Sequence, residues 1–106
     1  MSNAVVVHKG RNNTVDVSLF QDITGDTFTS DIRTGASRDS FLIAFWNVTV
    51  TDETVGDLSL YLSHTTTGYI RHNTGYMDLK RVTEDGSVEA IFDQPIRVMF
   101  RGTVTK

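Results

Sequence analysis

The stretch Leu58-Ser-Leu-Tyr-Leu-Ser63 decides the fold class of this chain. Leu58, Leu60 and Leu62 recur at every second residue, with Ser or Tyr between them. A β-strand turns alternate side chains to opposite faces, so this pattern predicts a strand with one buried face. A polar run follows from residue 64 to 74, and a second strand is expected from Tyr76. The chain is therefore expected to enter and leave one core around this polar run.

The same alternation continues outward in both directions from this stretch. It is found at residues 14–20, 28–32, 46–50, 76–82, 88–92 and 96–101. Polar turns separate the segments, and the pair Asp85-Gly86 is expected to form a hairpin turn. The segment 63–73 holds at most one turn of helix, with Ser63 as its N-cap. The sequence therefore predicts an all-β protein, an antiparallel β-sandwich of seven to eight short strands.

Two segments differ from the simple alternating strands, one in its apolar pattern and one in its place before the domain. Residues 41–50 begin apolar on both faces and then alternate, which predicts a strand covered on both faces at its first end only. Residues 1–13 are interpreted as an N-terminal arm and turn that precede a single sandwich domain at residues 14–106. Within the arm, Val5-Val6-Val7 is suited to adding a strand to the edge of a partner's sheet.

The composition is that of an ordinary globular domain. The chain has 106 residues, of which 39% are hydrophobic and 22% charged, and folding at this size buries roughly two thirds of the unfolded surface. A net charge of −3 disfavours a nucleic-acid partner. The chain lacks cysteine, which excludes disulfides and thiolate metal sites. Neither an apolar run long enough to span a bilayer nor a signal peptide is recognised, so no membrane partner is expected.

No residue pattern predicts catalysis or metal binding. His64 and His72 flank one loop but lack the spacing that pre-aims two imidazole rings, and His8 lies far away in sequence. The acidic turns at 22–26 and 52–57 lack the ligand spacing of a calcium loop, so turn-forming aspartates are favoured. A Gly-x-Ser-x-Gly elbow and a phosphate-binding glycine loop are both missing. We therefore expect no catalytic residues, no metal, no cofactor and no small-molecule ligand.

Exposed apolar and arginine side chains predict contacts with another chain. Tyr61 lies opposite the leucine face and is expected to point outward, whereas Tyr69 and Ile70 are expected in a water-exposed loop. Met99 shares a strand face with Arg97 and Arg101, and this mixture of apolar and basic side chains suits an interface. The candidate contact residues are Val5, Val6, Val7, Tyr61, Tyr69, Ile70, Arg97, Met99 and Arg101. The alternative is that these are scattered surface residues.

Aromatic rings also raise a sugar-binding hypothesis. Its candidate residues are Trp46, Tyr61 and Tyr69. Trp46 shares a face with Val48 and Val50, so filling of the core is favoured over a binding platform at that position.

Several short phrases of the sequence follow one another in a familiar order. They are Asp22-Ile-Thr-Gly25, Phe28-Thr-Ser-Asp-Ile-Arg33, the segment from Phe45 to Thr51, Gly56-Asp-Leu-Ser-Leu60, Gly75-Tyr-Met-Asp-Leu79, Asp85-Gly86 and Arg101-Gly-Thr-Val-Thr105. Together they resemble the small immunoglobulin-like β-sandwich modules of tailed-phage virion proteins, over residues 14–105. The chain departs from that pattern at Ile23, where the first phrase of the family has Leu, and at Asp93-Gln94-Pro95, which interrupts a strand.

The resemblance implies a non-enzymatic structural component of a virus particle. Such a protein joins or decorates parts of the tail, baseplate or fibre region, and it contacts other virion proteins and copies of itself. It would therefore be located in the virion. Two alternatives remain, a head decoration or cement protein and a carbohydrate-binding module of a receptor-binding fibre.

Overall fold

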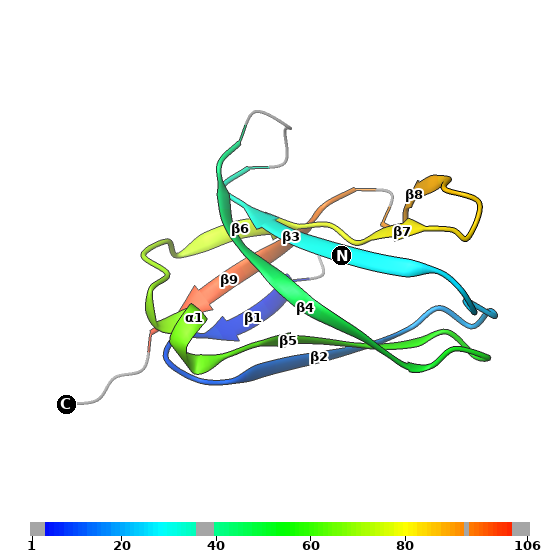
Figure 1. Ribbon diagram of the computed structural model, residues 1–106. Helices are drawn as coiled ribbons and strands as arrows, with labels where there is room; N and C mark the ends of the chain where they lie inside the picture. The colour runs from blue at the N-terminus through cyan, green and yellow to red at the C-terminus, as the bar shows by residue number, and fades with distance from the viewer. Residues whose placement is uncertain (1–3, 36–39, 93, 103–106) are drawn as a thin grey trace.

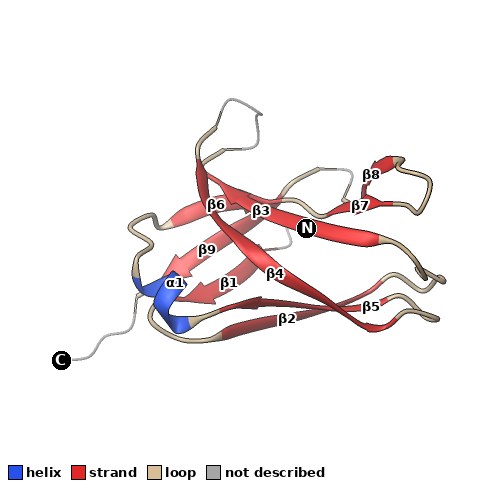
Figure 2. Cartoon of the chain, in the orientation of Figure 1, coloured by secondary structure: helices blue, strands red, loops and turns tan. Residues whose placement is uncertain are grey.

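The computed structural model describes residues 4–35, 40–92 and 94–102. Within these residues the chain forms nine strands and one short helix (Figures 1 and 2). The elements are β1 (Ala4–His8), β2 (Asn13–Ser18), β3 (Thr27–Arg33), β4 (Leu42–Asp52), β5 (Asp57–Leu62), α1 (His64–Gly68), β6 (Thr74–Met77), β7 (Lys80–Val82), β8 (Val88–Ala90) and β9 (Ile96–Arg101). The predicted continuation at 103–105 and the residue Asp93 lie outside the described residues.

Hydrogen bonds link the strands in the order β1-β9-β6-β3-β4-β5-β2, with β7 beside β3 and β8 beside β7. The path forms two layers because β4 belongs to both (Figure 1). The first half of β4 pairs with β3 as far as Trp46, and the second half of β4 pairs with β5 from Asn47 onward. One layer therefore contains β1, β9, β6, β3 and the start of β4, and the other contains the end of β4, β5 and β2.

This arrangement confirms the predicted β-sandwich of immunoglobulin-like type. The layers β4-β5-β2 and β9-β6-β3 reproduce the D-E-B and G-F-C sheets of the immunoglobulin fold. One detail differs from the prediction, because β1 pairs with β9 in parallel and the sheet is therefore mixed. A second difference concerns residues 76–82, which were predicted as one strand but form parts of two, β6 and β7, with Asp78 and Leu79 between them. Here β6 and β7 lie along β3 in a single register, with Met77 opposite Ile32 and Lys80 opposite Thr29.

The core lies between the two layers and is formed by the alternation that the sequence predicts. Leu58, Leu60 and Leu62 are at most 1% exposed, and they pack in one cluster with residues from the opposite layer such as Ile32 and Val98. Complete burial of each leucine side chain contributes about 1.5–3 kcal/mol to folding. The leucine stretch therefore supplies a large share of the apolar contacts that hold the layers together.

The helix α1 covers one end of the sandwich. The hydroxyl oxygen of Ser63 accepts a hydrogen bond from the backbone N–H of Thr66, as expected for an N-cap. Thr67 is fully buried, and its hydroxyl donates to the carbonyl of Arg11 at 2.8 Å and accepts from the N–H of Gly10 at 3.0 Å. The helix is thereby fastened to the turn between β1 and β2.

Candidate functional site

The outward face of the layer β1-β9-β6-β3-β4, called here the large sheet face, carries a mixture of apolar and basic side chains. Strand registers set one row of residues directly across this layer. The row is, in order, Leu42, Arg33, Tyr76, Arg97 and Ala4. Neighbours in such a row have side chains on the same face and close enough to touch a common partner.

Exposed apolar area on this face is concentrated on β4. Phe45 lies opposite Asp31 of β3 and is 61% exposed, and Leu42 is 50% exposed. Phe41, immediately before the strand, is 79% exposed. These values correct the prediction that both faces are covered at the first end of this strand. The apolar run does not signal double burial, because one of its faces is exposed on the outside of the molecule.

The charges of this face are only partly neutralised. Arg33 forms an ion pair with Asp31, with Nη2 at 3.3 Å from Oδ2, and also donates to the carbonyl of Ser40. Arg97 and Arg101 are exposed, and neither forms an ion pair within the described part of the chain. Two cations therefore remain available beside an apolar surface, a combination common at protein interfaces.

The structure brings together four of the predicted contact residues on this face. Val6, which is 38% exposed, lies opposite Met99, and Arg97 and Arg101 lie on either side of Met99. The other two valines of the arm point inward, since Val7 is fully buried. The arm is therefore a strand of the domain's own sheet, paired with β9, and this pairing corrects the interpretation of Val5-Val6-Val7 as a strand for a partner's sheet.

The remaining predicted contact residues lie elsewhere. Tyr61 is 37% exposed on the outward face of β4-β5-β2, beside Thr14 and Asn47. Tyr69 is 80% exposed in the turn after α1. Ile70, predicted in the same exposed loop, is only 7% exposed because the chain turns inward after α1. Tyr61, Tyr69 and the β9 residues therefore belong to three separate surfaces.

The sugar-binding hypothesis loses one of its residues. Trp46 is 3% exposed and belongs to the core cluster, so the core-filling interpretation is confirmed and its ring is unavailable to a ligand. The indole Nε1 is buried without a hydrogen-bond partner. Only Tyr61 and Tyr69 remain as exposed aromatic candidates for this hypothesis.

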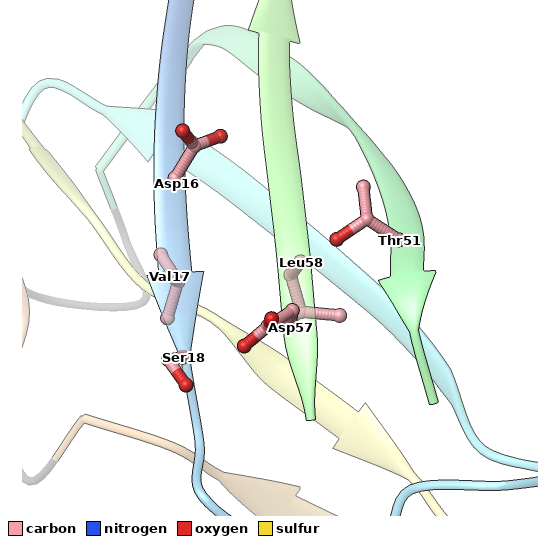
Figure 3. A pocket seen from close by; sticks show the side chains of 6 residues that line it. All are labelled: Asp16, Val17, Ser18, Thr51, Asp57 and Leu58. Atoms are coloured by element: carbon pink, nitrogen blue, oxygen red, sulfur yellow. The ribbon is translucent and has the colours of Figure 1, made fainter. Parts of the chain in front are cut away.

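A hollow of about 420 Å³ lies on the face of β4-β5-β2 (Figure 3). Three adjacent strands line it with Asp16, Val17, Ser18, Thr51, Asp57 and Leu58. Its two carboxylates have no third acidic or histidine ligand, and no group of three such residues could hold a metal ion within the described residues. The hollow therefore offers hydroxyl and carboxylate oxygens for polar contact.

The acidic turns are occupied by internal bonds, as the turn-forming interpretation predicts. Oδ1 of Asp22 accepts hydrogen bonds from the hydroxyl and the N–H of Thr24, and these bonds lower the pKa of Asp22. Oδ1 of Asp52 accepts the corresponding pair from Thr54. Asp26 instead forms an ion pair with Arg81. Each of these carboxylates therefore has a role in the local structure.

Sequence reasoning missed Leu42, Phe45, Arg33 and Tyr76 as members of the large sheet face, and it missed the exposure of Phe41 before β4. The available signal was the apolar run at 41–46, which is equally typical of a buried strand and of a strand with an adhesive outer face. A buried strand and a strand with an exposed apolar face differ in their cross-strand neighbours. Those neighbours are known only once the strand register is known.

Within the described residues, no helix has the length and apolarity needed to cross a membrane. No protein-family model and no curated protein sequence matches this chain. Among solved structures, the chain is similar to one chain of the crystal structure of the ZIG-8–RIG-5 IG1–IG1 heterodimer, monoclinic form. The two share 12% sequence identity at a TM-score of 0.48, over 95% of this chain and 83% of that chain.

Proposed function

We propose that this protein is a non-enzymatic structural protein of a tailed-phage particle, where it joins or decorates parts of the tail, baseplate or fibre region. The large sheet face is the docking surface in this proposal. The observation that carries it is the exposure of Phe45 and Leu42 beside a row that contains Arg33, Tyr76 and Arg97. The virion role itself rests on the resemblance of residues 14–105 to virion modules.

The energetics favour contact with a protein surface. Covering an exposed phenylalanine or leucine side chain stabilises a complex by up to about 1.5–3 kcal/mol. Aromatic residues and arginine are over-represented among the residues that dominate interface energies. A partner that covers the five strands of this layer would bury the apolar groups of β4 at one edge and leave Arg101, the last residue of β9, at the rim.

The experiment that tests this proposal is quantitative mass spectrometry of purified particles of the phage that encodes the chain. We expect the protein in a fixed copy number relative to the major capsid protein, retained after a density gradient and a high-salt wash. Loss of the protein at the gradient step, together with non-structural phage proteins, would contradict a virion role. Separate analysis of isolated heads and tails distinguishes the tail role from the head decoration or cement alternative.

The carbohydrate-binding alternative retains one specific observation, the 80% exposed ring of Tyr69. Aromatic rings that stand free in solvent are suited to stacking on sugars. A glycan array with the intact protein tests it, and Tyr69→Ala should abolish any binding that depends on that ring. Binding that survives this substitution would exclude Tyr69 as the platform.

A further inference from the structure

Several turns of the sandwich gather in two groups at opposite ends of the strands (Figure 1). One group, called here the acidic end, comprises residues 19–26, 52–57 and 81–89. Its segments are joined by hydrogen bonds from the N–H of Leu19 to the carbonyl of Gly56, at 2.9 Å, and from the N–H of Ile23 to the carbonyl of Glu53, at 2.8 Å. The ion pair of Asp26 with Arg81 attaches the third segment.

The other group, called here the basic end, comprises residues 8–12, 63–73 and 100–102. The N–H of Lys9 donates to the carbonyl of Arg101 at 2.8 Å. The N–H of His64 donates to Oδ1 of Asn12 at 2.7 Å, and Thr67 bonds to the same turn between β1 and β2. Each end is therefore a single surface assembled from three parts of the chain.

The two ends carry opposite charge. The acidic end holds Asp22, Asp26, Asp52, Glu53, Asp57, Glu84, Asp85 and Glu89, with Arg81 as the basic residue among them. The basic end holds Lys9, Arg11, Arg71 and Arg101 together with His8, His64 and His72, and its segments contain no Asp or Glu. The net charge of −3 for the whole chain therefore conceals a strong separation of charge along the molecule.

Local hydrogen bonds favour ionisation at the acidic end. Hydrogen bonds from Thr83 and Ser87 lower the pKa of Asp85, and those from Thr24 lower the pKa of Asp22. Both carboxylates are fully exposed and are therefore charged at neutral pH. The only positive charge of this end belongs to Arg81, which already faces Asp26 at 2.6 Å.

Each end also exposes one aromatic ring. At the acidic end Phe20 is 88% exposed, and its backbone has a φ of 57°, a conformation that a bulky side chain rarely adopts. Such strain persists only where neighbouring structure imposes it, here the bond that holds Leu19 to Gly56. At the basic end Tyr69 is 80% exposed. Each end therefore combines charges that are mostly of one sign with an exposed aromatic ring.

We infer that a second copy of this chain docks head to tail, with the acidic end of one copy on the basic end of the next. Complementary charge selects this partner and this orientation, because two identical ends repel each other. A contact between different surfaces of identical chains builds a ring or an open filament. This contact uses the ends of the sandwich and leaves the large sheet face free, so it goes beyond the proposed function.

The size of the ends limits the strength of the contact. The Cα atoms of the molecule span 28 by 27 Å across its two shorter axes, which gives an end a cross-section of roughly 750 Å² per partner. This is slightly below the roughly 800 Å² per partner of a standard stable interface. Association should therefore be weak, dominated by charge and sensitive to salt.

Sedimentation velocity and light scattering across protein concentrations test the inference. At about 20 mM salt the average mass of the native chain should rise with concentration, and at about 500 mM it should return to the 11.8 kDa of one chain. An average mass that stays at 11.8 kDa at every concentration and low salt would overturn the inference.

Two charge-reversed variants test the orientation. One carries Glu53→Lys and Glu84→Lys at the acidic end, and the other carries Arg11→Glu and Arg71→Glu at the basic end. Each alone should associate about tenfold to hundredfold more weakly, since one of its two ends has lost much of its charge. An equimolar mixture should associate again, through the unaltered acidic end of one variant and the unaltered basic end of the other. Variants that associate like the native chain, or a mixture that stays monomeric, would overturn the head-to-tail contact.

Two control variants separate this contact from other effects. Asp16→Lys changes the net charge as Glu53→Lys does but lies in the middle of β2, and it should leave association unchanged. Phe45→Ser lies on the large sheet face and should also leave self-association unchanged. A loss of association in Phe45→Ser would assign self-contact to the sheet face and overturn the end-to-end arrangement. Circular dichroism verifies that each variant is folded.

Discussion

Arg81 of β7 forms an ion pair with Asp26 of the turn before β3, with Nε at 2.6 Å from Oδ2. Only 15% and 6% of the two side chains are exposed. The guanidinium also donates to Oε1 of Gln21 at 3.3 Å and approaches Glu89 at 3.7 Å. This one cation therefore holds the hairpin of β7 and β8 against the loop between β2 and β3.

Removal of the cation should be costly, because it leaves the carboxylate of Asp26 covered and without its partner. We expect Arg81→Met to lower the free energy of unfolding by about 2–4 kcal/mol, measured by urea denaturation at neutral pH. The double variant Arg81→Met with Asp26→Leu should recover most of that loss, since neither charge then remains buried.

The pair of Arg33 and Asp31 provides the control, because it joins the same two residue types at 3.3 Å but has side chains that are 36% and 30% exposed. Arg33→Met should change the free energy of unfolding by no more than about 1 kcal/mol. Equal losses for Arg81→Met and Arg33→Met would show that burial does not determine the importance of these pairs.

Gly56 lies where the loop at 52–57 packs against the loop at 19–26, and the close approach of the two backbones there requires glycine. Its φ is +80°, and a Cβ atom there would lie 2.6 Å from the carbonyl oxygen of Gln21. Gly56→Ala should lower the free energy of unfolding by about 2–3 kcal/mol, from backbone strain and steric overlap together. Gly68→Ala is the control, because nothing lies within 4 Å of its Cβ and α1 favours alanine by up to about 1 kcal/mol. A neutral Gly56→Ala would contradict the close approach of the loops.

The pKa of Asp22 should rise towards its ordinary value in Thr24→Val, because the hydroxyl donor is the main cause of its lowered pKa. A carboxyl whose pKa is lowered by folding stabilises the native state above its unfolded pKa. That stabilisation is lost as the pH falls through the folded pKa. The native chain should therefore lose more stability on acidification than Thr24→Val does.

Carboxyl carbon shifts followed by NMR over an acidic titration measure the effect directly. The pKa of Asp85, which is lowered by Thr83 and not by Thr24, serves as the reference within the same sample. A titration of Asp22 that is unchanged in Thr24→Val would disprove the assigned cause.

Period-two alternation was sufficient to predict the sandwich and most of its core. Leu58, Leu60 and Leu62 are buried as the pattern requires, and Trp46 fills the core together with them. These predictions succeed because alternate residues of a strand point to opposite faces, so the buried side can be predicted from the local sequence. The Ser63 cap and the single helical turn were predictable for the same reason.

Properties that depend on distant partners could not be predicted in this way. Val7 is buried because β1 pairs in parallel with β9, at the other end of the chain. Ile70 is buried because it joins the core cluster directly after α1, a helix that Thr67 fastens to the turn between β1 and β2. Phe45 is exposed because β4 leaves one layer for the other and nothing covers its outer side within the described residues.

The charge separation of the two ends is also invisible in the overall composition. Acidic residues at 22–26, 52–57 and 84–89 are dispersed along the sequence, and antiparallel strands collect them at one end of the sandwich. The strand connections therefore place most acidic side chains at one end of the molecule, although they are spread along the sequence.

Site-specific photo-crosslinking inside purified particles tests the central claim most directly. The photoreactive residue p-benzoylphenylalanine replaces Phe45 on the large sheet face, and in a matched sample it replaces Thr49 on the outer face of β4-β5-β2. Irradiation should attach position 45 to one defined virion protein and leave position 49 without a product. A crosslink from position 49 alone, or from neither position in particles that contain the protein, would contradict docking through the large sheet face.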